Sequence, residues 1–119
     1  MRQFAIIAAW IALPFLLAAC GKDKSRMSNA ELGLNAQESR GRRIYNVECA
    51  GCHTAYSSRG IKGPGLVGLY KKKYLPSGLP SNDRFVTQAI VQGRGMMPAM
   101  GDALTPDQLA DLLAYLRTL

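Results

Sequence analysis

The sequence predicts a small all-α domain with three or more helices and long loops, preceded by an export signal. Three stretches combine a helix-capping residue with apolar residues at helical spacing, and we find no stretch with convincing strand alternation. The segments between them are rich in glycine and proline, which favours loops. A chain of 119 residues allows one compact domain plus appendages.

The N-terminus has the layout of a secretion signal, which we assign to residues 1–19. A short basic start precedes an almost wholly apolar run of about 14 residues, which is shorter than the roughly 20 needed to span a bilayer. The run ends in Leu17-Ala18-Ala19-Cys20, which resembles a bacterial lipoprotein signal and implies acylation of Cys20. The alternatives are an ordinary secretion signal beside a chance cysteine, or an uncleaved anchor.

Residues 20–34 are interpreted as a lipidated N-terminus and flexible tether, and residues 35–119 as the folded domain. The tether is polar and has little to bury. As a coil it would average roughly 20 Å end to end. The net charge of +7 suits an acidic partner or anionic lipid. The basic residues form no single stripe, which argues against nucleic acid.

The first predicted helix begins at Asn35 and runs to about Cys49. Asn35 and Glu38 form a capping-box pattern. Gly41 within this helix costs about 1 kcal/mol relative to alanine. Close approach of another helix, with Tyr45 one turn later on the same face, would justify that cost. A merely tolerated glycine is the alternative.

Two further helices are predicted after a loop over residues 56–68 and a proline-rich turn up to Pro80. The second helix starts at Ser81 or Asn82, ends at Gln92, and is followed by Gly93 as a left-handed terminator. Its expected apolar face is formed by Phe85, Ala89 and Ile90, with Val86 beside them.

The last helix carries the clearest signals in the chain. Thr105-Pro106-Asp107-Gln108 combines an N-cap, a proline at the first helical position and a capping-box glutamine. Apolar residues then recur at helical spacing at Leu109, Leu112, Leu113 and Leu116.

The chemistry is concentrated in Cys49-Ala50-Gly51-Cys52-His53. This spacing places two thiols on one side of a single turn and is typical of covalent haem attachment, with His53 available to the iron. A Cys49–Cys52 disulfide or redox dithiol is the rival use. Structural zinc is a weak alternative, because these residues supply three ligands and such sites usually need four.

His53 is the only histidine of the chain, so the second axial ligand of the iron cannot be another histidine of the same chain. The remaining soft donors cluster in Met96, Met97 and Met100. Pro98 biases Met97 toward extended backbone, so we favour Met97, with Met100 ahead of Met96 in reserve. Plain core packing is the alternative role of these methionines.

Taken in order, these features resemble a class I c-type cytochrome over essentially all of residues 35–119. The shared features are the first helix, the Cys-Ala-Gly-Cys-His motif, a Gly-Pro-Gly-Leu segment, a middle helix, a Met-Pro loop and the last helix. The resemblance implies one covalent haem c, a Pro64 carbonyl that accepts the His53 proton, and Leu66 packed on the haem. It also implies contact of Gly41 and Tyr45 with the last helix, near Leu112 and Tyr115. Residues 70–80 match no motif of that family.

The resemblance implies a one-electron carrier rather than an enzyme, because both axial positions would be filled. With Cys20 acylated, the protein would be exported, membrane-tethered, and would act between respiratory redox partners from the periplasm or cell exterior. Alternatives are a haem sensor or peroxidase-like protein with an open sixth position, and a fixed subunit of a respiratory complex. Candidates for partner docking are Lys71, Lys72 and Lys73, with Arg59 and Lys62. A solvated loop is the alternative role of these lysines.

Overall fold

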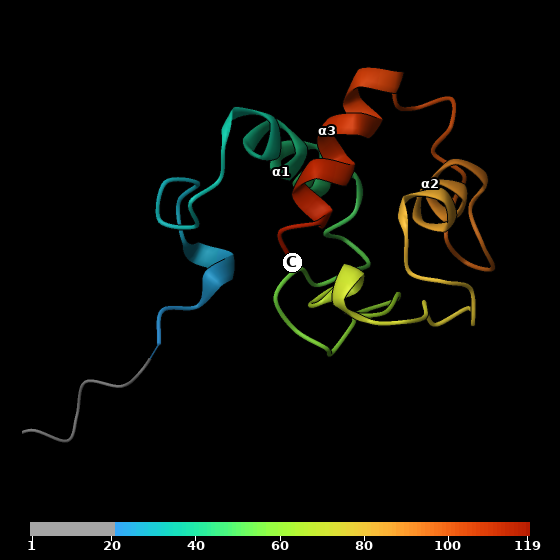
Figure 1. Ribbon diagram of the computed structural model, residues 1–119, viewed down its shortest axis with the longest axis horizontal. Coiled ribbons are helices and arrows are strands. Elements are labelled where there is room, and N and C mark those ends of the chain that lie inside the picture. The colour runs from blue at the N-terminus through green and yellow to red at the C-terminus, as the bar shows by residue number, and fades with distance from the viewer. Residues whose placement is uncertain (1–20) are drawn as a thin grey trace, which may run out of the picture.

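Three α-helices form the frame of the domain in the computed structural model, which describes residues 21–119 (Figure 1). The elements are η1 (Lys24–Arg26), α1 (Ala36–Glu48), η2 (Leu69–Lys71), α2 (Asp83–Gln92) and α3 (Pro106–Leu116). The described residues form two isolated β-bridges and no longer strand. The predicted all-α class is therefore confirmed.

The predicted signal segment 1–19 and Cys20 lie outside the described residues. Within residues 21–119, no helix is both long and apolar enough to cross a bilayer.

The helix starts follow the predicted capping residues. The Asn35 side chain accepts from the backbone N–H of Glu38, whose carboxylate accepts from the N–H of Asn35 in return. Thr105 and Gln108 make the same reciprocal pair at α3. Of the two predicted starts of the middle helix, Asn82 is the N-cap.

Helices α1 and α3 cross in close contact at Gly41 (Figure 1). A Cβ atom at Gly41 would lie 1.9 Å from the backbone oxygen of Asp111 and 2.8 Å from Cβ of Tyr115. Beside the crossing, Arg40 donates two hydrogen bonds to the Asp111 carboxylate, at 2.7 and 2.9 Å. The predicted contact of Gly41 with the last helix is confirmed.

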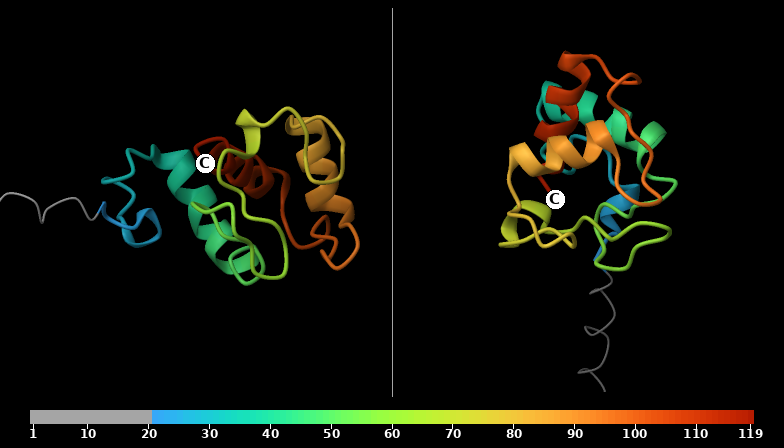
Figure 2. Two further views of the ribbon diagram at one scale, coloured as in Figure 1. Left: turned by 90° about the horizontal axis from the view of Figure 1, so that it is seen from below. Right: turned by 90° about the vertical axis from the view of Figure 1, so that its right-hand side faces the viewer.

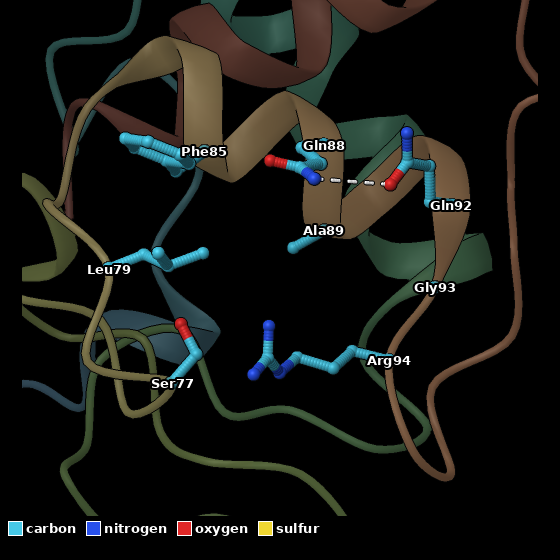
Figure 3. A pocket seen from close by; sticks show the side chains of 8 residues that line it. All are labelled: Ser77, Leu79, Phe85, Gln88, Ala89, Gln92, Gly93 and Arg94. Atoms are coloured by element: carbon cyan, nitrogen blue, oxygen red, sulfur yellow. Dashed lines mark hydrogen bonds between the residues drawn. The ribbon is translucent and has the colours of Figure 1, made fainter.

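The core gathers around α3, where Leu112 and Tyr115 are almost completely buried. Helix α2 contributes Val86 and Ile90. The other two residues predicted for its apolar face, Phe85 and Ala89, are only half-buried and line a shallow pocket beside α2 (Figure 3).

Residues 22–34, which we call the strap, belong to the segment that the sequence predicts as a flexible tether, and the structure gives them hydrogen bonds within the segment and to the domain. The backbone N–H of Ser28 donates to the Glu31 carboxylate at 2.8 Å, and η1 adds a further turn. Arg42 of α1 donates to the side-chain oxygen of Asn29 at 2.8 Å, and Leu34 packs against the core. A side chain 13 residues away in the sequence therefore holds the strap on the domain.

The segment over residues 70–80, which has no counterpart among the family motifs, closes on itself through a bridge between Tyr74 and Pro80. The hydroxyl of Ser81 donates to the Leu69 carbonyl and joins the two ends of this loop. The loop leads directly into the N-cap of α2 and so sets where that helix begins.

Candidate functional site

The two cysteines of the candidate site lie on one turn that continues from the end of α1. The backbone N–H groups of Cys52 and His53 both donate to the Cys49 carbonyl, at 3.1 and 3.0 Å. Both thiols are free and half-buried. Burial, with smaller contributions from Glu48 and Cys52, raises the pKa of the Cys49 thiol to about 11. A thiol whose pKa is raised is a poor nucleophile at neutral pH, which opposes redox-dithiol chemistry at Cys49.

The imidazole of His53 is oriented by the loop that follows it. Its Nδ1 lies 2.8 Å from the Pro64 carbonyl oxygen, which can only accept, so Nδ1 carries the proton and Nε2 is left as the metal-binding atom. The N–H of Gly63 donates to the Cys52 carbonyl at 2.8 Å. A Cβ atom at Gly63 would lie 2.4 Å from His53 Cε1, so only glycine lets this loop close on the ring.

Three tyrosine hydroxyls join this loop to the helical frame. Tyr45 of α1 donates to the His53 carbonyl at 2.8 Å, and Tyr56 and Tyr115 share a hydrogen bond of 2.9 Å. The rings of Tyr45 and Tyr115 pack 5.4 Å apart. Burial raises the pKa of Tyr45 to about 12, so its hydroxyl keeps its proton. The sequence did not predict these hydrogen bonds. It indicated only that Tyr45 lies one turn after Gly41 on the same face of the helix.

The methionine segment forms a tight turn after α2. Arg94 and Met97 exchange backbone hydrogen bonds of 3.1 and 3.0 Å, and Gly93 and Gly95 take the left-handed φ values of 70° and 59°. Met96, at the tip of this turn, is 85% exposed. Met97 is half-buried and packs against the core.

Met100 also packs against the core, and its N–H donates to the Ile90 carbonyl at 2.9 Å. The exposed side chain of Met96 therefore differs from those of Met97 and Met100, which are both half-buried.

The remaining predicted residues lie on the same loops. Leu66 is half-buried against the core. Lys71, Lys72 and Lys73 are all exposed, but Lys71 Nζ donates to the Leu119 carbonyl oxygen at 3.2 Å. The other two candidates for docking, Lys72 and Lys73, make no side-chain hydrogen bond with the described residues.

These donors fit a covalently bound haem. Two free thiols lie on one turn, an imidazole offers Nε2, and the thioethers of Met97 and Met100 are half-buried on the segment that follows α2. Within residues 21–119, no three His, Cys, Asp or Glu side chains lie together as metal ligands. The zinc alternative therefore has no fourth ligand among these residue types in the described part of the chain.

Comparison with known proteins agrees with this donor set. The family model described as "Cytochrome C oxidase, cbb3-type, subunit III" matches residues 36–116. The chain belongs to this family of c-type cytochromes. As a class I monohaem cytochrome it carries a covalent haem c and transfers electrons rather than acting as an enzyme.

Several curated proteins are similar to this cytochrome. The cytochrome c-551 of Bacillus subtilis is 30% identical over 81% of this chain and 80% of its own length. A "Cytochrome c6-like" protein of Nostoc is 33% identical over 74% of this chain and 71% of its own length. A "Cytochrome bc1 complex cytochrome c subunit" of Corynebacterium diphtheriae is 30% identical over 78% of this chain, which spans only 31% of that protein.

Proposed function

We propose that this cytochrome is a membrane-tethered one-electron carrier whose haem is bonded to Cys49 and Cys52 and whose iron is ligated by His53 and Met97. The observation that carries the proposal is the orientation of His53. The Pro64 carbonyl holds its Nδ1 proton, which leaves Nε2 for the iron. When bound, haem with histidine and methionine ligands supplies a one-electron couple at a raised potential.

Met97 is the proposed second ligand because its backbone is fixed and its side chain is half-buried. The reciprocal bonds with Arg94 hold it at the end of a two-residue turn. Met100 has a similar burial and stays the reserve candidate, whereas the 85% exposure of Met96 argues against it. Leu66 would contribute apolar contact to the haem.

The ligand assignment is tested by replacing each methionine with alanine in the haem-loaded protein. We expect Met97→Ala to abolish the near-infrared absorption band of the oxidised iron–thioether bond and to allow carbon monoxide to bind the reduced iron rapidly. Met96→Ala is the matched control and should change neither property. Loss of the band in Met100→Ala alone would transfer the role to Met100, and carbon monoxide binding by the wild type would favour a sensor.

The proposed tether is acylated Cys20, at the end of the segment that resembles a lipoprotein signal. Mass spectrometry of the mature protein tests it directly, since a chain beginning at Cys20 should carry one haem plus acyl groups. A mature protein without acyl groups would contradict the proposed tether and would indicate a carrier that is not anchored through Cys20.

Docking to an acidic redox partner is proposed for Lys72 and Lys73, with Lys71 weakened by its bond to Leu119. Reversing the charge of both free lysines should slow electron transfer from the physiological partner and reduce its dependence on salt. Among single charge reversals, Lys71→Glu is the matched control and should have a smaller effect than Lys72→Glu or Lys73→Glu. Equal effects at all three positions would show that the bond to Leu119 does not limit docking.

A second candidate function is a fixed subunit of a respiratory complex. The family description names a subunit of an oxidase, and the similar Corynebacterium protein is named a subunit of a bc1 complex. Purification from native membranes in mild detergent distinguishes the two. A free carrier should migrate alone, and a subunit should migrate with stoichiometric companions.

A further inference from the structure

The strap shortens the connection between Cys20 and the folded domain. The side chain of Asp23 caps η1 by accepting from the Ser25 N–H at 3.0 Å, and Arg42 holds the backbone carbonyl of Ser25 at 3.3 Å. The fold thus begins three residues after Cys20, and three residues reach at most about 11 Å. If Cys20 is acylated, as proposed above, the strap end of the domain must lie beside the membrane.

The loop over residues 57–62 lies at the same end of the domain. Asp23 and Ser25 of the strap line a cleft of about 380 Å³ together with Ser57 and Ile61 of this loop. The strap and α2 lie at opposite ends of the folded domain in Figure 1 and in the left view of Figure 2. Lipid beside the strap would therefore meet this loop and not α2.

The side chains of this end suit an anionic lipid surface. Ile61 is 62% exposed, and its neighbours Arg59 and Lys62 are exposed and make no ion pair with the described residues. An exposed apolar side chain between two cations combines the two attractions that interfacial segments use. The strap adds three exposed basic residues, of which one is paired with a carboxylate: Lys22, Lys24 and Arg26.

We propose that the strap and the 57–62 loop form one surface, which lies flat on the anionic lipid of the membrane that holds Cys20. This inference rests on the proposed acylation. Five basic side chains against the two acidic ones, Asp23 and Glu31, give the surface its attraction for negative headgroups. Chain continuity favours lipid over an acidic protein here, because the membrane is within about 11 Å of the strap whether or not a partner is present.

Lysine labelling on vesicles tests the surface with the whole mature haem protein. The acylated protein is reconstituted into neutral phosphatidylcholine vesicles or into vesicles containing phosphatidylglycerol, and each lysine is labelled with a water-soluble amine reagent. We expect anionic lipid to lower the labelling of Lys22, Lys24 and Lys62 about fivefold, the factor that corresponds to the roughly 1 kcal/mol gained per basic residue. Lys72 and Lys73, at the end of η2 and just after it, are internal controls. Each should be labelled to the same extent on neutral and on anionic vesicles.

Two further measurements sharpen the result. About 1 M salt, where the Debye length is near 3 Å, should restore labelling. The double variant Arg59→Gln and Lys62→Gln should lose most of the protection at Lys22 and Lys24. The matched variant Lys72→Gln and Lys73→Gln should keep it. All four side chains are exposed, so both variants should fold.

Equal labelling of the strap lysines in neutral and anionic vesicles would overturn the proposed surface. Protection that requires an acidic partner protein and not anionic lipid would overturn it as well. Failure of acylation is separable, because the protein would then fail to float with neutral vesicles. An unacylated protein that still floats with anionic vesicles and is protected at the same lysines would support the surface.

Discussion

Substituting Gly41 by alanine tests the close crossing of α1 and α3. The new Cβ would meet the backbone oxygen and carbon of Asp111 at 1.9 and 2.6 Å, and neither atom can move without moving α3. Ordinary carbon contacts need about 3.5 Å or more, so the helices must separate by more than 1 Å at this point. Separation would also loosen the packing of the Tyr45 ring against the Tyr115 ring of α3, whose centroids lie 5.4 Å apart.

Two opposing effects decide the magnitude. Alanine is the better helix former by about 1 kcal/mol, which would stabilise an uncrowded site. Forcing a methyl group into a packed interface costs typically 1–3 kcal/mol and occasionally more. Because the clash at Gly41 is with backbone, we place the cost at the upper end of this range. The net loss in unfolding free energy should be about 2 kcal/mol, which lowers Tm by roughly 10 °C in a domain of this size.

The assay is thermal unfolding of the haem-loaded protein, followed by far-ultraviolet circular dichroism and by Soret absorption. Asn46→Ala, at an exposed α1 position, is the matched control and should raise Tm slightly through helix propensity alone. A Gly41→Ala protein as stable as the wild type would refute the reasoning, because the helices would then tolerate a side chain at their contact.

Three other changes probe the site and its frame. Gly93→Ala should weaken the iron–methionine absorption band, because φ is +70° there and a Cβ atom would lie within about 3 Å of the turn backbone; an unchanged band would contradict this. Tyr45→Phe should cost about 1 kcal/mol in denaturant unfolding, since it keeps the ring and removes one buried hydrogen bond; an unaltered midpoint would show that water replaces the hydroxyl. Arg40 holds the pKa of Asp111 below its usual 3.8, so the stability from this pair is present above that pH and is lost as pH falls through the lowered pKa. Arg40→Gln should therefore be less stable than the wild type at pH 7, with a difference that narrows below pH 3.8, and a gap constant with pH would argue against the pairing.

The sequence was informative wherever a structural signal is local. Capping pairs such as Asn35 with Glu38 act over three residues, so they could be recognised before any tertiary contact was known. The same holds for Gly93, whose left-handed φ ends α2 as predicted. Cys49, Cys52 and His53 are also close in sequence, and the turn that joins them needs no distant partner.

Features that depend on distant residues were missed. The strap reads as polar and unstructured by composition, yet it is held by Arg42, a side chain on another element. The bond between Tyr56 and Tyr115 joins residues 59 positions apart, and nothing in either sequence neighbourhood signals it. The bond from Lys71 to the Leu119 carbonyl was missed for the same reason, because its partner lies 48 residues away.

The glycines of the loop that orients the imidazole have a consequence for reading mutational data on this protein. Cβ atoms at Gly60 and Gly65 would lie 1.8 and 2.1 Å from backbone oxygens of neighbouring segments, so almost every substitution there should fail. Neither glycine offers an atom that could ligate iron or bond to a porphyrin. A saturation screen scored only by electron transfer would rank them with Cys49 and Cys52, as though they were functional. Scoring haem content and folded abundance separately would distinguish positions that bind the haem from positions where any side chain would clash with the backbone.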